Sequence, residues 1–316
     1  MSSWTQFVED LAWMALNASL MLVLAPLVDG FVRKLAARLQ GRIGPPIIQP
    51  YRDLRKLLAR TITTRPIAGS ELLYKLAPVA LLSVTLCACS LIPTVAAKPV
   101  ALSNFILVFY LLALSRFISS LMALNVPNPF AAIASSREHL LALGVEPAAM
   151  LSVAMMALAT SSPSLGGIAT VLPTVIERHA ATYILALAAF SMVMVADLAL
   201  PPFDIAEAEQ EIYEGIASEY GGPYLALIKL CASCKRVALM SLLIAAFVPF
   251  GMSTGVSPWI AASIALYLAK LFLVATAVTL LYTASARLRI VDVPRYLLIA
   301  ISISMLSGIM YLLRVA

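Results

Sequence analysis

The chain has 316 residues, of which 62% are hydrophobic and only 12% are charged, and its mean hydropathy is +0.96. This composition excludes a soluble globular domain and predicts an all-α integral membrane protein. The formal net charge of +6 gives no support to nucleic-acid binding, because the Lys and Arg residues gather in loops predicted for one side of the membrane.

Apolar runs long enough to cross a bilayer as helices recur about eight times along the chain. They cover residues 11–32, 74–96, 100–123, 148–172, 181–200, 236–252, 258–283 and 295–313. We expect the first run to stay in the protein as a span, since no Arg-rich or cleavable leader precedes it, and the fourth to end near Thr160. The prediction is a single polytopic membrane domain over residues 1–316, with about eight transmembrane helices and additional cytoplasmic amphipathic helices.

Basic residues predict the orientation, since cytoplasmic loops carry an excess of Lys and Arg. The loops predicted for the cytoplasmic side are residues 33–73, 125–147, 203–235 and 284–294. The loops and termini of the opposite side hold only Lys98, Arg178 and Arg314. With eight spans, both termini are then predicted outside, in the inner (cytoplasmic) membrane of the cell.

The first cytoplasmic loop combines a rigid half with a helical half. Glycines and prolines make residues 41–50 a non-helical path. The residues that then form an apolar stripe are Tyr51, Leu54, Leu57 and Leu58. The opposite, charged face consists of Arg52, Asp53, Arg55, Lys56 and Arg60. This pattern is typical of a helix lying on the membrane surface, whose basic face can contact anionic lipid or dock a partner protein.

The second cytoplasmic loop, residues 125–147, begins with a turn rich in Asn and Pro. Ser135 or Ser136 can cap a helix that carries Arg137 and Glu138. Glu146 is expected at the mouth of the fourth span. Because an ionisable group at membrane depth usually lines a wet cavity or a charge path, Glu146 is a candidate functional residue.

Asp197 lies near the end of an otherwise uncharged run. It should therefore be partly desolvated and poised to take up and release protons near neutral pH. Arg116 and Lys270 lie inside other apolar runs and are candidate partners within the membrane.

The densest charge cluster is PPFDIAEAEQEIYEGIASEY, residues 201–220, which holds six of the sixteen acidic residues. Pro201 and Pro202 end the preceding run, and Asp204 can cap a new helix with Glu207 three residues on. On a 3.6-residue repeat one stripe is acidic and another is apolar. The acidic stripe consists of Asp204, Glu207, Glu211 and Glu214, with Glu209 to the side and Glu219 beyond. It fits either a solvated helix N-terminus or the wall of a polar path.

The cysteine and histidine positions do not predict a metal site. Two cysteines lie in an apolar run, Cys231 and Cys234 form a lone C-x-x-C, and the two histidines are predicted on opposite sides of the membrane. A metal or cluster site needs further ligands at suitable spacing, and no phosphate-binding loop or nucleophile motif occurs. We expect no catalytic residue, metal or cofactor in this chain.

Four motifs, in this order, carry a resemblance to a known family. They are GRIGPPIIQPYRDLRKLL (41–58), PFAAIASSREHLLALGVEP (129–147), PPFDIAEAEQEIYEG with SEYGG (201–215 and 218–222) and ARLRIVDVPR (286–295). The chain resembles the membrane subunit of respiratory complex I that forms the quinone chamber, the H-type or subunit 1 type. It resembles most the hydrogenase branch of that family, in formate hydrogenlyase and hydrogenase-4 type energy-converting complexes.

The resemblance implies eight spans, one of them markedly tilted, and partners that carry the redox chemistry. These would be hydrogenase-type large and small peripheral subunits that hold a nickel-iron centre and iron-sulfur clusters, with antiporter-like membrane subunits and lipid alongside. The implied proton path comprises Asp204, Glu207, Glu209, Glu211, Glu214, Glu219, Asp197, Glu146, Glu138 and Arg137. The residues expected to dock the peripheral arm are Arg42, Arg52, Asp53, Arg55, Lys56, Arg287, Arg289 and Arg295.

One departure from the family bears on function. Quinone-reducing relatives usually have Glu-Thr-Asn-Arg before Pro-Phe-Asp, whereas this chain has Asp197, Leu198, Ala199 and Leu200. The basic residue is missing, which makes quinone reduction less favoured and leaves proton coupling through Asp197 open.

The sequence therefore predicts a non-catalytic membrane anchor and coupling subunit of an energy-converting hydrogenase-type complex, which links electron transfer to proton or sodium translocation. One alternative is the quinone-chamber subunit of a complex I-type dehydrogenase. Another is a stand-alone ion or solute carrier, against which the chain shows no internal repeat and no matched pair of broken spans.

Overall fold

The computed structural model describes residues 2–61, 69–98, 102–204, 215–253, 260–289 and 291–313. Within these ranges the chain is helical and has no strand. Its elements are α1 (Ser2–Leu39), α2 (Gln49–Leu58), α3 (Glu71–Leu91), α4 (Phe105–Asn125), α5 (Pro129–Ala159), α6 (Leu165–Arg178), α7 (Ala180–Asp197), the short 3₁₀ helix η1 (Gly215–Ala217), α9 (Gly222–Phe247), α10 (Ile260–Ala284) and α11 (Val293–Leu312).

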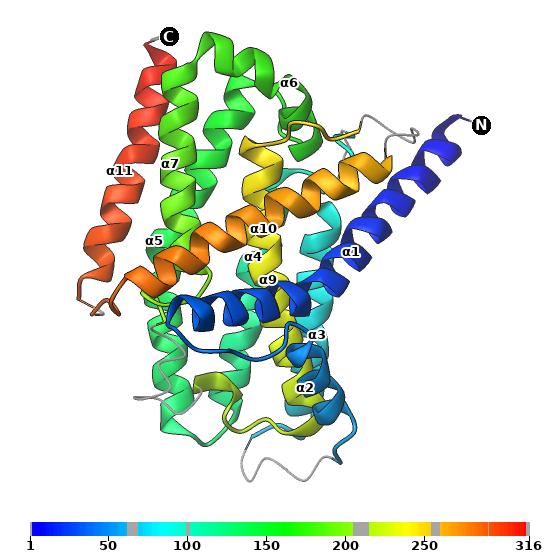
Figure 1. The fold of residues 1–316 in the computed structure, drawn as a ribbon, viewed down its shortest axis with the longest axis vertical. Coiled ribbons are helices and arrows are strands. Elements are labelled where there is room, and N and C mark those ends of the chain that lie inside the picture. Colours follow the sequence, from blue (N-terminus) through cyan, green and yellow to red (C-terminus); the bar gives the residue numbers. More distant parts are fainter. Residues whose placement is uncertain are drawn as a thin grey trace.

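Eight of the described helices are long and apolar enough to cross a membrane: α1, α3, α4, α5, α7, α9, α10 and α11. This confirms the predicted all-α membrane fold with about eight spans. Figure 1 shows both termini toward the same end of the molecule, as an even number of spans requires. α2 is the short amphipathic helix predicted after the first span.

The helices do not run parallel to one another. α10 and α1 cross the bundle obliquely in Figure 1, whereas α7 and α9 lie closer to its long axis. α1 also changes direction along its length, and it contains Pro26, a residue that kinks helices because it lacks the backbone N–H donor. α9 is the central helix of the described bundle: it contacts α1, α2, α3, α6, α7 and α10, and it is the most deeply buried span.

Two helix boundaries differ from the prediction. α5 begins at Pro129, where the side chain of Asn128 accepts a hydrogen bond from the Phe130 N–H at 2.9 Å. Residues 129–147, predicted as loop, are therefore helical, and the predicted serine cap is wrong because Ser135 lies buried inside α5. α9 begins at Gly222, well before the predicted start near residue 236.

The fourth apolar run ends as predicted, because α5 stops at Ala159 and Thr160 is its C-cap. Ser161 follows with a positive φ of 54°, and the Ser164 hydroxyl then accepts a hydrogen bond from the Gly167 N–H at 3.1 Å to start α6. The core contains side chains from most spans. A second, smaller cluster around Tyr74, Met122 and Tyr220 packs the ends of α3, α4 and α9 together.

Candidate functional site

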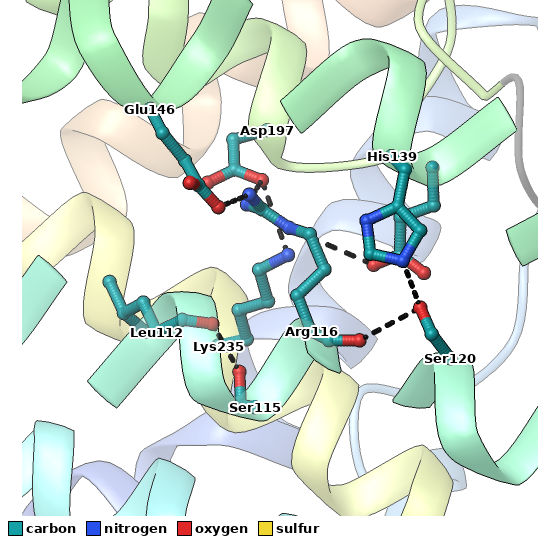
Figure 2. A network of polar contacts seen from close by, with 9 residues as sticks. Leu112, Ser115, Arg116, Ser120, His139, Glu146, Asp197 and Lys235 are labelled. Carbon is teal, nitrogen blue, oxygen red and sulfur yellow. Dashed lines mark hydrogen bonds and ion pairs between the residues drawn. The ribbon is translucent and has the colours of Figure 1, made fainter. Parts of the chain in front are cut away.

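The main polar site lies inside the bundle and is centred on Arg116 of α4 (Figure 2). Its side chain is only 4% exposed, and its guanidinium contacts carboxylates from two other helices. Nη2 donates a hydrogen bond to Asp197 Oδ1 at 2.8 Å, and Nη1 donates to Glu146 Oε1. Nε lies 3.9 Å from Glu138 Oε1. A buried guanidinium is tolerated in such a place because paired carboxylates replace the water that it loses.

Asp197 has a second cationic partner, Lys235 of α9, whose Nζ lies 3.2 Å from the same Oδ1 atom. Asp197 is the last residue of α7 and its side chain is 8% exposed. A carboxylate is unfavourable at a helix C-terminus, so the two cations compensate both the burial and the helix dipole. We call Arg116, Glu138, Glu146, Asp197 and Lys235 the Arg116 cluster.

The cluster corrects two details of the sequence interpretation. The carboxylate of Asp197, predicted to be poised for proton exchange, is buried and paired with two cations. Arg116 is one of its partners, as predicted, but Lys270 is not: Lys270 Nζ donates to the Val248 carbonyl at 2.7 Å, beyond the end of α9. Glu146 lies inside α5 rather than at its mouth, yet its side chain is 40% exposed.

The prediction missed Lys235 and His139. Lys235 was assigned to a loop, although a helical reading of residues 222–247 places it one turn from Cys231 on the buried side of α9. His139 follows Glu138 on α5, and its Nε2 forms a hydrogen bond with the Ser120 hydroxyl of α4 (Figure 2). This contact joins the two helices that carry Arg116 and its two glutamates.

A second buried ion pair joins α1 to α9. Arg236 Nε donates to Asp29 Oδ1 at 3.0 Å, and its Nη2 donates to Oδ2 at 2.7 Å. The Ser233 hydroxyl also donates to Asp29. The sequence interpretation missed this pair as well, because Asp29 stands alone in the first apolar run and Arg236 was placed at a span boundary.

Two cavities adjoin these ion pairs. A small cavity of about 140 Å³ is lined by Arg116, Glu138, Asp197 and Lys235, together with apolar side chains such as Leu81 and Phe203. A larger one of about 390 Å³ lies between α1, α2 and α9. Ala217, Ile228, Ala232 and Arg236 line both cavities. The two cavities therefore share part of their walls.

The predicted proton-path residues fall into separate groups. Glu138, Glu146 and Asp197 belong to the Arg116 cluster, and Arg137 lines the small cavity. Asp204 instead pairs with Arg287, whose Nη2 lies 3.3 Å from Oδ2. Glu219 accepts a hydrogen bond from Asn128 Nδ2 at 3.0 Å. Glu207, Glu209, Glu211 and Glu214 lie outside the described residues.

The predicted docking residues are mostly exposed. Exposed side chains among them are Arg42, Arg52, Arg55, Lys56, Arg287, Arg289 and Arg295. Asp53 is half-buried and accepts a hydrogen bond from Gln49 Nε2 at 2.8 Å. Arg295 lies 3.7 Å from Asp292, the N-cap residue of α11. The interface that these residues would make stays a prediction.

Metal ligands do not converge in the part of the chain that the structure describes: no group of three or more His, Cys, Asp or Glu side chains there could hold a metal ion. The four cysteines are free thiols, with Cys89, Cys231 and Cys234 buried between α3 and α9 and Cys87 exposed. Thr85 and Cys231 pair across that interface at 3.0 Å. These contacts are typical of packed helices.

The profile of a protein family described as NADH dehydrogenase matches residues 11–312. Hydrogenase-4 component C of Escherichia coli (strain K12) is 37% identical to this chain over 243 residues, which are 76% of this chain and 76% of that protein. Formate hydrogenlyase subunit 4 of the same strain is 31% identical over 283 residues, 89% of this chain and 92% of that protein. The H-type subunit of NADH-quinone oxidoreductase from Bradyrhizobium diazoefficiens is 26% identical over 262 residues, 72% of this chain and 74% of that protein.

A solved structure shares the fold as well. One chain of the membrane-bound sulfane sulfur reductase, described as an archaeal respiratory membrane complex, superposes with a TM-score of 0.80 at 25% identity. The match covers 94% of this chain and 99% of that chain. The agreement therefore extends over nearly the whole of both chains.

Proposed function

Since this chain belongs to the NADH dehydrogenase family and is a membrane subunit of the respiratory-complex type, we propose that it anchors a hydrogenase-type redox arm and couples electron transfer to ion translocation. The resemblance to the hydrogenase branch of complex I subunits is confirmed by these relatives. The proposal concerns which subunits this chain binds, which ion is moved and how electron transfer is coupled to that movement.

The observation that carries the proposal is the Arg116 cluster. Three carboxylates and two cations share a space where Asp197 and Arg116 are almost fully buried. In such surroundings the charge on one group strongly affects its neighbours, because water screens the interaction poorly. Protonation of Asp197 or Glu146 would free one contact of Arg116, so that a charge change at one end of the cluster alters proton affinity at the other.

The geometry also gives this cluster two ends. Asp197 faces the small cavity, whereas Glu146 is partly exposed on α5. The guanidinium of Arg116 lies between the two carboxylates (Figure 2). A proton taken up at Asp197 can therefore be matched by release at Glu146, which suits a relay between a redox arm and a neighbouring ion-translocating subunit.

The exposed basic residues of α2 and of the segment between α10 and α11 would dock the redox arm, since a charged face favours and orients protein association. The test is purification in mild detergent from the native host with identification of the co-purifying subunits. Hydrogenase-type large and small subunits with bound nickel and iron are expected. Recovery of the chain without other subunits would contradict the proposal and favour a stand-alone carrier.

The docking surface is tested by charge reversal. Arg52→Glu combined with Arg55→Glu should release the peripheral subunits at lower salt than the unaltered chain does, since exposed charge pairs are screened as ionic strength rises. Arg178→Glu, on an exposed α6 residue of the opposite predicted side, serves as the control. Peripheral subunits retained equally by both variants in high salt would exclude α2 from docking.

A quinone-chamber subunit is the second candidate. The small cavity supports it, because it combines polar groups with apolar walls, and one relative belongs to an NADH-quinone oxidoreductase. Its volume of about 140 Å³ is below the roughly 300–1,000 Å³ of ordinary small-molecule sites, and Leu200 replaces the usual basic residue. Inhibition of the purified complex by quinone analogues, with density beside Asp204, would favour this candidate over the hydrogenase-type subunit.

A further inference from the structure

The larger cavity, of about 390 Å³, is enclosed by three elements that come from distant parts of the chain. α2 lies beside α1 and the first turns of α9 (Figure 1). Because α2 is an amphipathic helix between two membrane spans, this space lies where the bilayer meets water. We call it the basic cavity, for the charges described below.

Specific contacts hold α2 in this position. The Tyr51 hydroxyl of α2 donates to the Val23 carbonyl of α1. The backbone before α2 approaches α1 so closely that a Cβ atom on Gly30 would lie 1.9 Å from the Ile47 carbonyl oxygen. At the other end, Gly222 has a positive φ of 56° and starts α9 next to the backbone of Arg60. The cavity walls are therefore fixed by packing at both ends of α2.

The charges around the basic cavity are predominantly positive. Its lining includes five cationic side chains: Arg33, Lys56, Arg60, Lys229 and Arg236. It also includes the carboxylates of Asp29 and Asp53. Asp29 is occupied by Arg236 and Ser233, and Asp53 accepts a hydrogen bond from Gln49.

The other four cations, on Arg33, Lys56, Arg60 and Lys229, are exposed, and none forms an ion pair with a carboxylate of the described residues. Arg33 belongs to α1, Lys56 to α2 and Lys229 to α9, and Arg60 lies two residues beyond the end of α2. Four positive charges from separate segments therefore surround one space. Like charges repel each other, and an anion among them would relieve that repulsion.

The remaining wall of the basic cavity is apolar. Pro50, Leu54 and Leu57 contribute it from α2, and Ile228 contributes it from α9. A soluble anion would leave this wall in contact with water. An amphiphile that carries a phosphate at one end and hydrocarbon at the other matches both surfaces, and basic pockets between spans on the cytoplasmic side bind acidic phospholipid headgroups.

From this combination of charge, apolar wall and position, we infer that the basic cavity binds the headgroup of an anionic phospholipid. The phosphate lies among Arg33, Lys56, Arg60 and Lys229, and the first part of an acyl chain lies along Leu54, Leu57 and Ile228. Arg236, held by Asp29, lines both this cavity and the small one beside the Arg116 cluster. This lipid site goes beyond the proposed coupling function and does not depend on it.

The arrangement favours lipid over an acidic segment of a partner protein. Asp53 and Lys56 of the predicted docking residues line the cavity, but Arg52 and Arg55 do not, whereas Leu54 and Leu57 of the apolar stripe do. α2 thus separates two surfaces, one facing the aqueous side with Arg52 and Arg55 and one facing the cavity with Leu54 and Leu57.

The test measures phospholipid retained by the purified complex. The complex is washed in detergent and mixed with increasing phosphatidylglycerol or phosphatidylcholine, and bound lipid is counted by native mass spectrometry. Arg33→Gln with Lys229→Gln removes two charges from the cavity. Lys34→Gln with Arg38→Gln removes two charges from the same region of α1 that do not line the cavity, and serves as the matched control.

We expect the unaltered complex and the control to bind phosphatidylglycerol more tightly than phosphatidylcholine. The cavity variant should bind phosphatidylglycerol roughly 30-fold more weakly than the unaltered complex, since each basic residue near a membrane surface contributes about a factor of five. Arg60→Gln removes one cavity charge, at a residue beyond the end of α2, and should weaken binding by about a factor of five. This single variant tests the inference even if the double variant fails to assemble.

Three results would overturn the inference. The first is equal phosphatidylglycerol binding by the cavity variant and the control. The second is release of peripheral subunits from the cavity variant with lipid binding unchanged, which would assign the cations to a protein partner. The third is competition by glycerol phosphate at the same concentration as the lipid, which would identify a site for a soluble phosphate compound.

Discussion

At the scale of single residues, Arg116 determines whether the buried carboxylates can stay ionised. It is the residue that contacts Glu138, Glu146 and Asp197 together, and it comes from a different helix from any of them. Lys235 reaches only Asp197 among them. Removing the guanidinium would leave two partly exposed glutamates of α5 without the cation that they face, and it would leave the buried Asp197 with Lys235 alone. Breaking a buried ion pair by removing one partner costs several kcal/mol.

Arg116→Leu is therefore expected to destabilise the protein by about 3–5 kcal/mol, because it breaks a buried ion pair by removing one partner. The midpoint of thermal unfolding in detergent and the yield of assembled complex should both fall. Arg178→Leu, at an exposed position of α6, should change neither by a measurable amount. Equal stability of the two variants would mean that the carboxylates around Arg116 are protonated in the folded protein.

Asp197→Asn keeps the size of the side chain and removes its ability to carry a proton. We expect the complex to assemble and its redox rate to persist, while ion translocation per electron falls, since losing a proton-transfer group slows that transfer by about 100-fold or more. Proteoliposomes with a pH-sensitive dye measure the ratio. Asp292→Asn, on a half-buried residue near α11, should leave the ratio unchanged, and a normal ratio for Asp197→Asn would remove Asp197 from the path.

At the scale of helices, close approach between elements decides where α2 lies. Gly30 is in the middle of a helix, where glycine is unfavourable for the backbone, yet a side chain there would meet the Ile47 carbonyl oxygen at 1.9 Å. Backbone cannot move aside as a flexible side chain can. Gly30 therefore permits the contact that holds the start of α2 on α1.

Gly30→Ala should displace residues 41–50 from α1 and destabilise the protein by about 1–3 kcal/mol, the usual cost of overpacking. Faster proteolysis within that segment would report the displacement. Gly308→Ala is the control, because its new Cβ would meet the flexible end of Met155 at 3.1 Å. Equal proteolysis of both variants would show that Ile47 can move away from α1 without consequence.

The number of spans and the amphipathic helix were predictable from hydropathy and periodicity, whereas helix starts inside charged segments were not. The part of α9 from its start to its middle carries Lys229, Lys235 and Arg236, which made it look like a loop. Two of these cations pair with Asp197 and Asp29, residues separated from them by 38 or more positions in the chain. Hydropathy averages cannot register a partner so distant in sequence, because the pairing arises only when the helices pack.

The candidate site was predictable in part for the same reason. Asp197, Glu146 and Arg116 stood out because each is a charged residue in apolar surroundings, and the structure brings these three together. Lys235 and Asp29 did not stand out, because one was hidden in a basic segment and the other in a long first span. Pro147 made Glu146 look like a span boundary, although α5 continues through it.

At the scale of the whole molecule, the distribution of charge divides the bundle into two unlike ends. The end that carries α2 and the start of α5 is basic, and it holds the basic cavity. The other end holds both termini and α6 (Figure 1). Lys98 lies beside the start of α1: its Nζ is 3.0 Å from Glu9 and 3.0 Å from Asp10, and the hydrogen bonds that it donates to Asp10 and then to Glu9 raise the pKa of Lys98. That end gives little resistance to translocation across a membrane because it carries few Lys and Arg residues.

Both termini are therefore expected on the outer side of the cytoplasmic membrane, because positively charged loops stay on the cytoplasmic side and eight spans return the chain to the side where it began. Alkaline phosphatase fused after Ala316 should be active, since it folds only when exported, and green fluorescent protein at the same position should stay dark. The same two reporters fused after Arg60, within the basic segment, provide the control and should give the reverse result. Fluorescence from the fusion after Ala316 would contradict this orientation. In the opposite orientation α2, the basic cavity and the proposed docking surface would lie on the outer side, where no cytoplasmic redox arm could reach them.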